Sequence, residues 1–180
     1  GNLLGAEQSG HINAVGFDLY CQLLKAAVAS LKGRKDVSIL PEVDLSLDFV
    51  DFGHQARDGK VAAGIPPKYM PSERLRIDFY RRFATAQSEK EVEGIREEII
   101  DRFGKLPIQA ENMQRIMKIR VRVAKGGYNS LSVTDGSVLI EGTRRGVYML
   151  GRSIPHVAGK SPAQWLDSLE AIAGDIKPAG

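Results

Sequence analysis

The chain of 180 residues contains a single cysteine, Cys21, so it has no internal disulfide framework and no cysteine-rich metal site. No apolar run approaches the roughly 20 residues that a transmembrane helix needs. The net charge is small, because 25 Lys and Arg residues face 22 Asp and Glu residues. This near balance argues against a protein that binds nucleic acid mainly by electrostatic attraction. These features predict a globular domain from a reducing, cytoplasmic compartment.

The sequence also lacks the motifs by which common enzyme classes are recognised. It contains neither a G-x-x-x-x-G-K-[ST] phosphate loop nor a G-x-G-x-x-G segment after a strand. Its three histidines, His11, His54 and His156, are far apart and have no partners at metal-ligand spacing. We therefore predict that this chain is not an enzyme by itself and holds no metal or cofactor of its own.

Hydrophobic periodicity predicts a helix over about residues 13–32, three helices in the middle of the chain and one near the C-terminus. Ser88 and Glu91 match a capping box, in which the serine accepts a hydrogen bond from the first turn and the glutamate reaches back. The third middle helix is expected to end near Lys125. The last four helices should begin at or just after Ser72, Ser88, Pro107 and Ser161.

Strand signals come from either end of this helical middle. Polar and apolar residues alternate strictly over residues 42–49, which predicts a strand with one buried and one solvated face. Glycine and proline are frequent over 53–67, and we expect a loop there.

A β-hairpin is predicted after the third middle helix. Residues 130–133 and 137–140 flank Asp135-Gly136, which is a strong signal for a two-residue turn. Residues 147–150 are expected to add a third strand. The predicted fold class is α+β, with a helical middle and a small, mainly antiparallel sheet.

Charge is distributed unequally over the middle helices. Residues 89–101 contain six acids and two bases, whereas residues 105–125 contain six bases and one acid. Four of these bases share one helical face, because they are three or four residues apart: Arg115, Lys118, Arg122 and Lys125. A solvated polar face is the ordinary interpretation, and a nucleic-acid interface that contacts phosphates is the alternative.

A second charged cluster lies at the end of the acidic helix. Glu98, Asp101 and Arg102 are three and four residues apart and lie away from the apolar stripe of that helix. Mixed charges on a rigid helix end suit a complementary protein surface. Asp101 also opposes the helix dipole, which mildly favours a functional reason for its presence. From the residues alone, a solvated helix end remains the simpler interpretation.

Several segments resemble a known family. Residues 1–12 (GNLLGAEQSGHI) and 15–20 (VGFDLY) resemble the segment that follows the second motor domain of bacterial transcription-repair coupling factors. Residues 69–71 (YMP) and 98–104 (EIIDRFG) resemble the C-terminal domain of that family in order and spacing. The similarity is specific as far as Pro107, and beyond it only the order of elements is similar.

The resemblance implies that the parent protein is an ATP-dependent DNA translocase, related to helicases, which displaces stalled RNA polymerase and recruits the excision-repair protein UvrA. Gln8 would be the glutamine of the translocation motif, flanked by Gly5 and Gly10. The chain begins within that motif at Gly1, so we expect it to be a piece of a longer protein. ATP and Mg²⁺ would belong to motor domains of the parent.

The same resemblance divides the chain into three parts. Residues 1–12 would be the tail of the translocation motif, 13–36 a linking helix and 37–180 a regulatory domain. In this family the C-terminal domain masks the N-terminal UvrA-binding module until the protein engages polymerase and duplex DNA. Three residues of this chain match the positions that make this interdomain contact: Glu98, Asp101 and Arg102.

Overall fold

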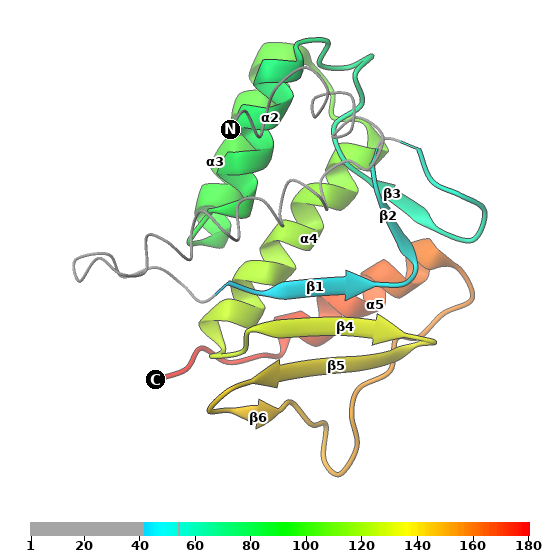
Figure 1. The fold of residues 1–180 in the computed structure, drawn as a ribbon, viewed down its shortest axis with the longest axis vertical. Coiled ribbons are helices and arrows are strands. Elements are labelled where there is room, and N and C mark those ends of the chain that lie inside the picture. The colour runs from blue at the N-terminus through cyan, green and yellow to red at the C-terminus, as the bar shows by residue number, and fades with distance from the viewer. Residues whose placement is uncertain (1–41, 54) are drawn as a thin grey trace, which may run out of the picture.

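The computed structural model describes residues 42–53 and 55–180. The elements run in the order β1-β2-β3-α2-α3-α4-β4-β5-β6-α5 (Figure 1). The helix expected over 13–32, the translocation-motif residues and Cys21 lie outside the described residues, as do the first two parts of the predicted domain division.

The main sheet has four strands in the order β1-β4-β5-β6. β1 lies parallel to β4, and the pairs β4–β5 and β5–β6 are antiparallel. The strands span Asp44–Leu47 (β1), Ser130–Thr134 (β4), Ser137–Gly142 (β5) and Gly146–Val147 (β6). The predicted α+β class with a mainly antiparallel sheet is confirmed.

The segment before the helices differs from the prediction in two ways. The strand expected over residues 42–49 is shorter, because the chain turns after β1 and enters a second strand, β2 (Val50–Phe52). The expected loop over 53–67 contains a strand, β3 (Val61–Ala63), which pairs in parallel with β2. Three residues between glycine-rich stretches carry too little periodicity to reveal a strand that only its tertiary partner stabilises.

The predicted hairpin is present. Asp135 and Gly136 have φ values of +49° and +84°, the left-handed conformations that a tight two-residue turn between twisted strands requires. The third strand is shorter than predicted, since β6 ends at Val147 and Leu150 makes only an isolated bridge with Ser153.

The helices begin where the sequence predicts. Ser88 caps α3 by accepting a hydrogen bond from the Glu91 N–H, as expected for a capping box. The Glu91 carboxylate accepts a hydrogen bond from the Gln87 N–H, one residue earlier than the standard partner. The helices span Glu73–Ala84 (α2), Glu89–Phe103 (α3), Ile108–Lys125 (α4) and Pro162–Gly174 (α5).

Helix α4 is the centre of the fold (Figure 1). It packs against α3, α5 and β3, and Met113, Ile116 and Met117 are fully buried, as predicted. The sheet contributes Leu131 and Ile140 to the same core. Because α4 occupies the middle, α2 and α3 lie together at one end of the molecule (Figure 1).

Candidate functional site on helices α2 and α3

The segment just before α2 contacts the C-terminal end of α3. The Tyr69 hydroxyl donates a 2.6 Å hydrogen bond to the carbonyl oxygen of Gly104, which terminates α3 with a φ of +90°. The rings of Tyr69 and Phe103 lie 5.9 Å apart. These contacts hold the end of α3, and with it the predicted charged cluster, in a defined position.

Glu98 is paired within the domain. Arg82 of α2 donates hydrogen bonds of 2.7 and 2.9 Å to the two carboxylate oxygens of Glu98, and Arg102 lies 3.7 Å from the same carboxylate. The hydrogen bonds from Arg82 hold the pKa of Glu98 below its usual value of 4.5. Glu98 therefore stays ionised at neutral pH and links the two helices.

The two arginines also cover an aromatic ring. The guanidinium carbons of Arg82 and Arg102 lie 5.1 and 5.7 Å from the centroid of the buried Phe79 ring, which is cation–π geometry. Beside this ring is a hollow of about 330 Å³. It is lined by Leu75, Asp78, Phe79, Arg81, Arg82 and Arg102.

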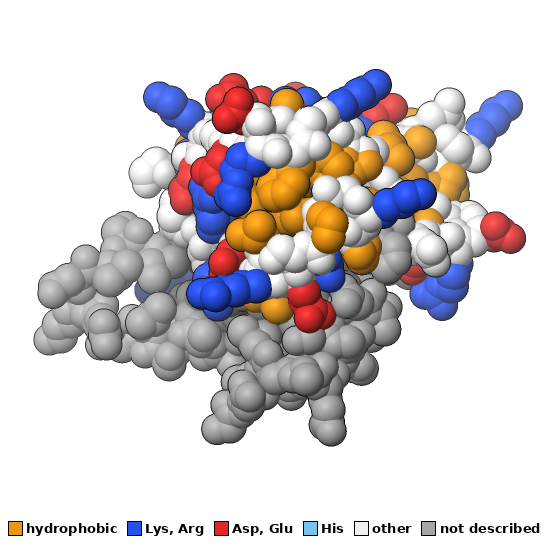
Figure 2. Space-filling model, turned by 90° about the horizontal axis from the view of Figure 1, so that it is seen from above, with side chains coloured by type: hydrophobic (Ala, Val, Ile, Leu, Met, Phe, Trp, Pro, Cys, Tyr) orange, Lys and Arg blue, Asp and Glu red, His pale blue; other side chains and the backbone are white. Residues whose placement is uncertain are grey.

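Asp101 differs from Glu98. Its side chain is exposed, and it makes no hydrogen bond or ion pair with any other residue in the part of the chain described here. Figure 2 shows the molecule from above, where hydrophobic side chains gather with charged side chains of both signs around them. The structure thus brings the three predicted residues together, with one carboxylate paired and one directed to solvent. We call the set Phe79, Arg82, Glu98, Asp101 and Arg102 the α2–α3 surface.

The contribution of α2 to this surface was not predicted from the sequence. Phe79 and Arg82 are three residues apart, so they share a helical face, and this spacing is visible in the sequence. It does not indicate that α3 would lie against that face. Only the packing of α2 on α3 reveals that Arg82 meets Glu98.

The basic face of α4 forms ion pairs within the domain. The Lys118 ammonium lies 2.6 Å from the Glu93 carboxylate, and Arg122 donates a 2.9 Å hydrogen bond to Glu89. The hydrogen bond from Lys118 holds the pKa of Glu93 below 4.5. The acidic helix and the basic helix are thus neighbours whose charges complement each other.

The other end of this face pairs with α5. Arg115 donates hydrogen bonds of 2.7 Å to Glu170 and 2.6 Å to Asp167. Burial alone would lower the pKa of Arg115, but the hydrogen bonds to these two carboxylates raise it. Lys125, the last of the four cations, is exposed. Three of the four predicted DNA-contacting residues therefore already have carboxylate partners, and the nucleic-acid alternative stays a prediction.

The remaining predictions concern the translocation motif, metal sites and membrane-spanning helices. Gln8, Gly5 and Gly10 lie outside the described residues. Among residues 42–53 and 55–180, no group of three or more His, Cys, Asp or Glu side chains is arranged to hold a metal ion. No helix in this same part of the chain is both long and apolar enough to cross a membrane.

Known proteins resemble the chain over most of its length. A family model described as the TRCF domain matches residues 60–146. The transcription-repair-coupling factor of Bacillus subtilis is 32% identical over 203 residues, covering 98% of this chain and 16% of the relative. The Escherichia coli protein of the same name is 35% identical over 141 residues, covering 78% of this chain and 12% of the relative.

A solved structure shares the fold. The crystal structure of a C-terminal domain of transcription-repair coupling factor superposes with a TM-score of 0.58 at 16% identity. The match covers 76% of this chain and 92% of that one. The chain thus spans about a sixth or less of the curated relatives but corresponds to nearly all of a separately solved C-terminal domain.

Proposed function

This chain belongs to the TRCF-domain family of transcription-repair coupling factors, and from that membership we propose that it regulates its parent by masking the UvrA-binding module. The α2–α3 surface would make the interdomain contact. The observation that carries this proposal is the arrangement of Glu98, Asp101 and Arg102 on one exposed helix end beside Phe79 and Arg82.

The surface has the components of a protein interface. Arg82 and Arg102 present guanidinium groups held by the Glu98 carboxylate and the Phe79 ring, so little side-chain entropy remains to be lost on binding. Asp101 offers a carboxylate to a partner cation. Arginine is one of the residue types that are enriched among those that dominate binding energies.

Masking would operate as a two-state switch. In the closed state the α2–α3 surface contacts the UvrA-binding module, and ligands that prefer the open state release it. A coupling free energy of about 1–3 kcal/mol changes the affinity of such a site by roughly 5- to 150-fold. Two or three exposed charge pairs are sufficient for this range and remain easy to reverse.

The wider function is proposed for the parent protein. We infer a cytoplasmic ATP-dependent DNA translocase that displaces stalled RNA polymerase and recruits UvrA in nucleotide excision repair. ATP and Mg²⁺ would act in its motor domains, and the domain described here would need no cofactor. Its contribution would be binding alone.

Titration calorimetry of this chain with the isolated N-terminal UvrA-binding module tests the proposal. Asp101→Arg should weaken binding at least tenfold, because it replaces the exposed carboxylate by a positive charge that repels the cations of the partner. Asp58→Arg is the matched control, since Asp58 is an exposed acid in the loop before β3. The wild-type chain should also compete with UvrA for the module. Equal affinities for Asp101→Arg, Glu98→Ala and wild type would show that masking uses another surface.

A further inference from the structure

The segment after β5 exposes an unusual share of apolar area. Across the described residues, four large hydrophobic side chains are exposed, and three of them are close together in this segment. Val147, Met149 and Leu150 are 42%, 43% and 47% exposed. Clustered exposed apolar side chains on a globular domain mark interaction sites more often than scattered ones.

The backbone directs two of these side chains, Val147 and Met149, outward. β6 is the last strand of the main sheet, and the Tyr148 N–H continues its ladder with a 2.8 Å hydrogen bond to the Ile140 carbonyl. Tyr148 packs edge-to-face on Tyr128, with ring centroids 5.9 Å apart. Because side chains alternate along an extended segment, Val147 and Met149 lie on the opposite side from Tyr148.

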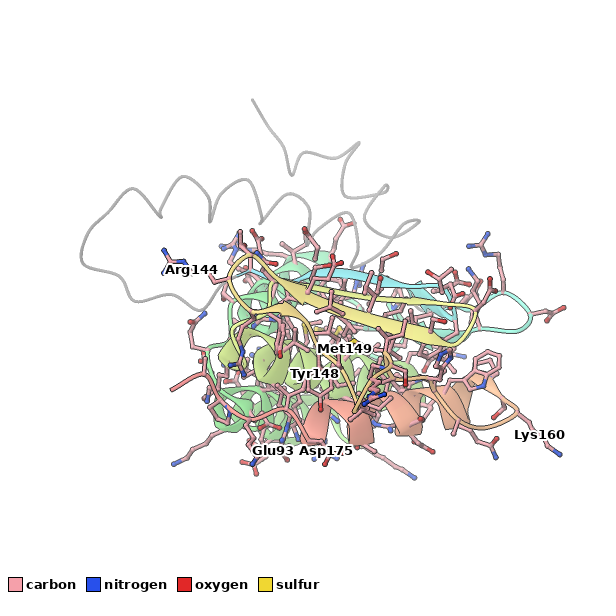
Figure 3. All side chains as sticks on the ribbon, turned by 90° about the horizontal axis from the view of Figure 1, so that it is seen from below. Glu93, Arg144, Tyr148, Met149, Lys160 and Asp175 are labelled. Atoms are coloured by element: carbon pink, nitrogen blue, oxygen red, sulfur yellow. The ribbon has the colours of Figure 1, made fainter. Side chains whose placement is uncertain are left out.

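Cations lie at both ends of this apolar stretch. Arg144 is in the turn between β5 and β6, and Arg152 is in a turn closed by two hydrogen bonds between Leu150 and Ser153. Both arginines are exposed. Figure 3 shows Arg144 toward one end of the sheet, Met149 near its middle and Lys160 beyond the other end, so Lys160 is not part of this group.

Cations prevail in the sequence around this stretch. Residues 142–166 contain four Lys and Arg and no Asp or Glu. Of these, Arg145 is held against the domain by a 3.0 Å hydrogen bond to the Gly126 carbonyl and by the Tyr128 ring. Two acids adjoin the group. Glu141 on β5 is opposite Val147 in the strand register, and Asp175 lies close enough to Tyr148 that, after burial, its charge also raises the pKa of that hydroxyl.

We propose that this group binds an acidic protein segment that carries apolar side chains. The group, named the β6 surface, consists of Arg144, Val147, Met149, Leu150 and Arg152. Its arginines complement carboxylates, and its three exposed apolar side chains complement leucine or phenylalanine side chains. A nucleic-acid backbone would satisfy the arginines but would leave the apolar centre without a partner.

The β6 surface is independent of the α2–α3 surface. Figure 1 places β6 and the following turn at the opposite end of the molecule from α2 and α3. An acidic segment could therefore occupy the β6 surface while the α2–α3 surface is engaged. Binding at the β6 surface does not require that masking occurs.

A display library of random 12-residue peptides, selected on the 180-residue chain, supplies the probe. We expect enriched peptides to carry net negative charge and at least two large apolar residues. Fluorescence anisotropy with the enriched peptides should show at least tenfold weaker binding by Met149→Ser/Leu150→Ser and, separately, by Arg144→Glu/Arg152→Glu. Ile108→Ser/Lys90→Glu is the matched control, because it changes one exposed hydrophobic and one exposed cation on other elements.

Three outcomes would overturn the proposal. Enriched peptides could be basic or uncharged, or they could bind all variants equally. Alternatively, a 20-bp duplex DNA could bind in competition with the peptides and respond to the arginine variant alone, which would assign the surface to nucleic acid. Unchanged melting temperatures of both variant pairs would confirm that any loss of binding is local.

Discussion

Arg82 of α2 and Glu98 of α3 form a two-pronged ion pair, with both terminal guanidinium nitrogens within 2.9 Å of the carboxylate oxygens. The pair joins two helices at positions 16 residues apart in the sequence. Because Arg102 shares the same carboxylate, Glu98 positions both arginines of the α2–α3 surface. Asp101, three residues later, makes no such contact within the described residues and is exposed.

The two acids should therefore differ in how much their substitution lowers the free energy of unfolding. Glu98→Gln should lower the free energy of unfolding by up to about 1 kcal/mol, because a part-exposed ion pair is lost. Asp101→Asn should change it by less than about 0.5 kcal/mol. Urea unfolding followed by circular dichroism measures both. Equal destabilisation by the two variants would mean that Asp101 has a structural partner.

The Arg82–Glu98 pair should make stability depend on pH. The pKa of Glu98 is lower in the folded state than its usual 4.5, so the pair stabilises the fold above that value. This contribution is lost as pH falls through the folded-state pKa. The difference in unfolding free energy between wild type and Glu98→Gln should therefore be largest near neutral pH and should vanish once the pH is below the folded-state pKa of Glu98. A difference that grows on acidification would contradict the assignment.

Two glycines should respond to alanine in opposite directions. A Cβ at Gly142 would lie 2.6 Å from the Gly127 carbonyl oxygen, a backbone atom that cannot rotate away. Gly142→Ala should therefore destabilise the domain by about 1–3 kcal/mol. Gly94 is within α3, and a Cβ added there would have no neighbouring atom within 4 Å. Gly94→Ala should therefore stabilise the domain by about 0.5–1 kcal/mol. Thermal unfolding of the two variants provides the comparison.

Arg115 should be a structural residue that anchors α5. Arg115→Ala removes the hydrogen bonds to Asp167 and Glu170 and should destabilise by about 1 kcal/mol, discounted for the exposure of both carboxylates. Lys125→Ala, on the same face, should have little effect on stability. Electrophoretic mobility shifts with duplex DNA at about 150 mM salt test the alternative. Tight binding that disappears on removing Arg115, Lys118 and Arg122 would favour the nucleic-acid interface.

Much of the local structure is encoded locally. The caps at Ser72, Ser88 and Ser161 each accept a hydrogen bond from the N–H three residues on, so the polar signal and the helix start coincide. The turn at Asp135-Gly136 needs left-handed backbone that these residues tolerate. Such features depend on neighbours within four residues, which is why the sequence suffices to predict them.

The sequence by itself determined the order of most elements, the mixed class and the uneven distribution of charge. Only the tertiary structure decided what that charge does. Glu89 and Glu93 meet Arg122 and Lys118 because α3 and α4 lie side by side, and periodicity describes one helix at a time. The pairing of β3 with β2 also depends on tertiary contacts. The same holds for the ion pair of Glu98 with Arg82 and for the exposure of Asp101. Contacts between distant residues depend on how the elements fit together around one core, and that fit is a property of the whole chain.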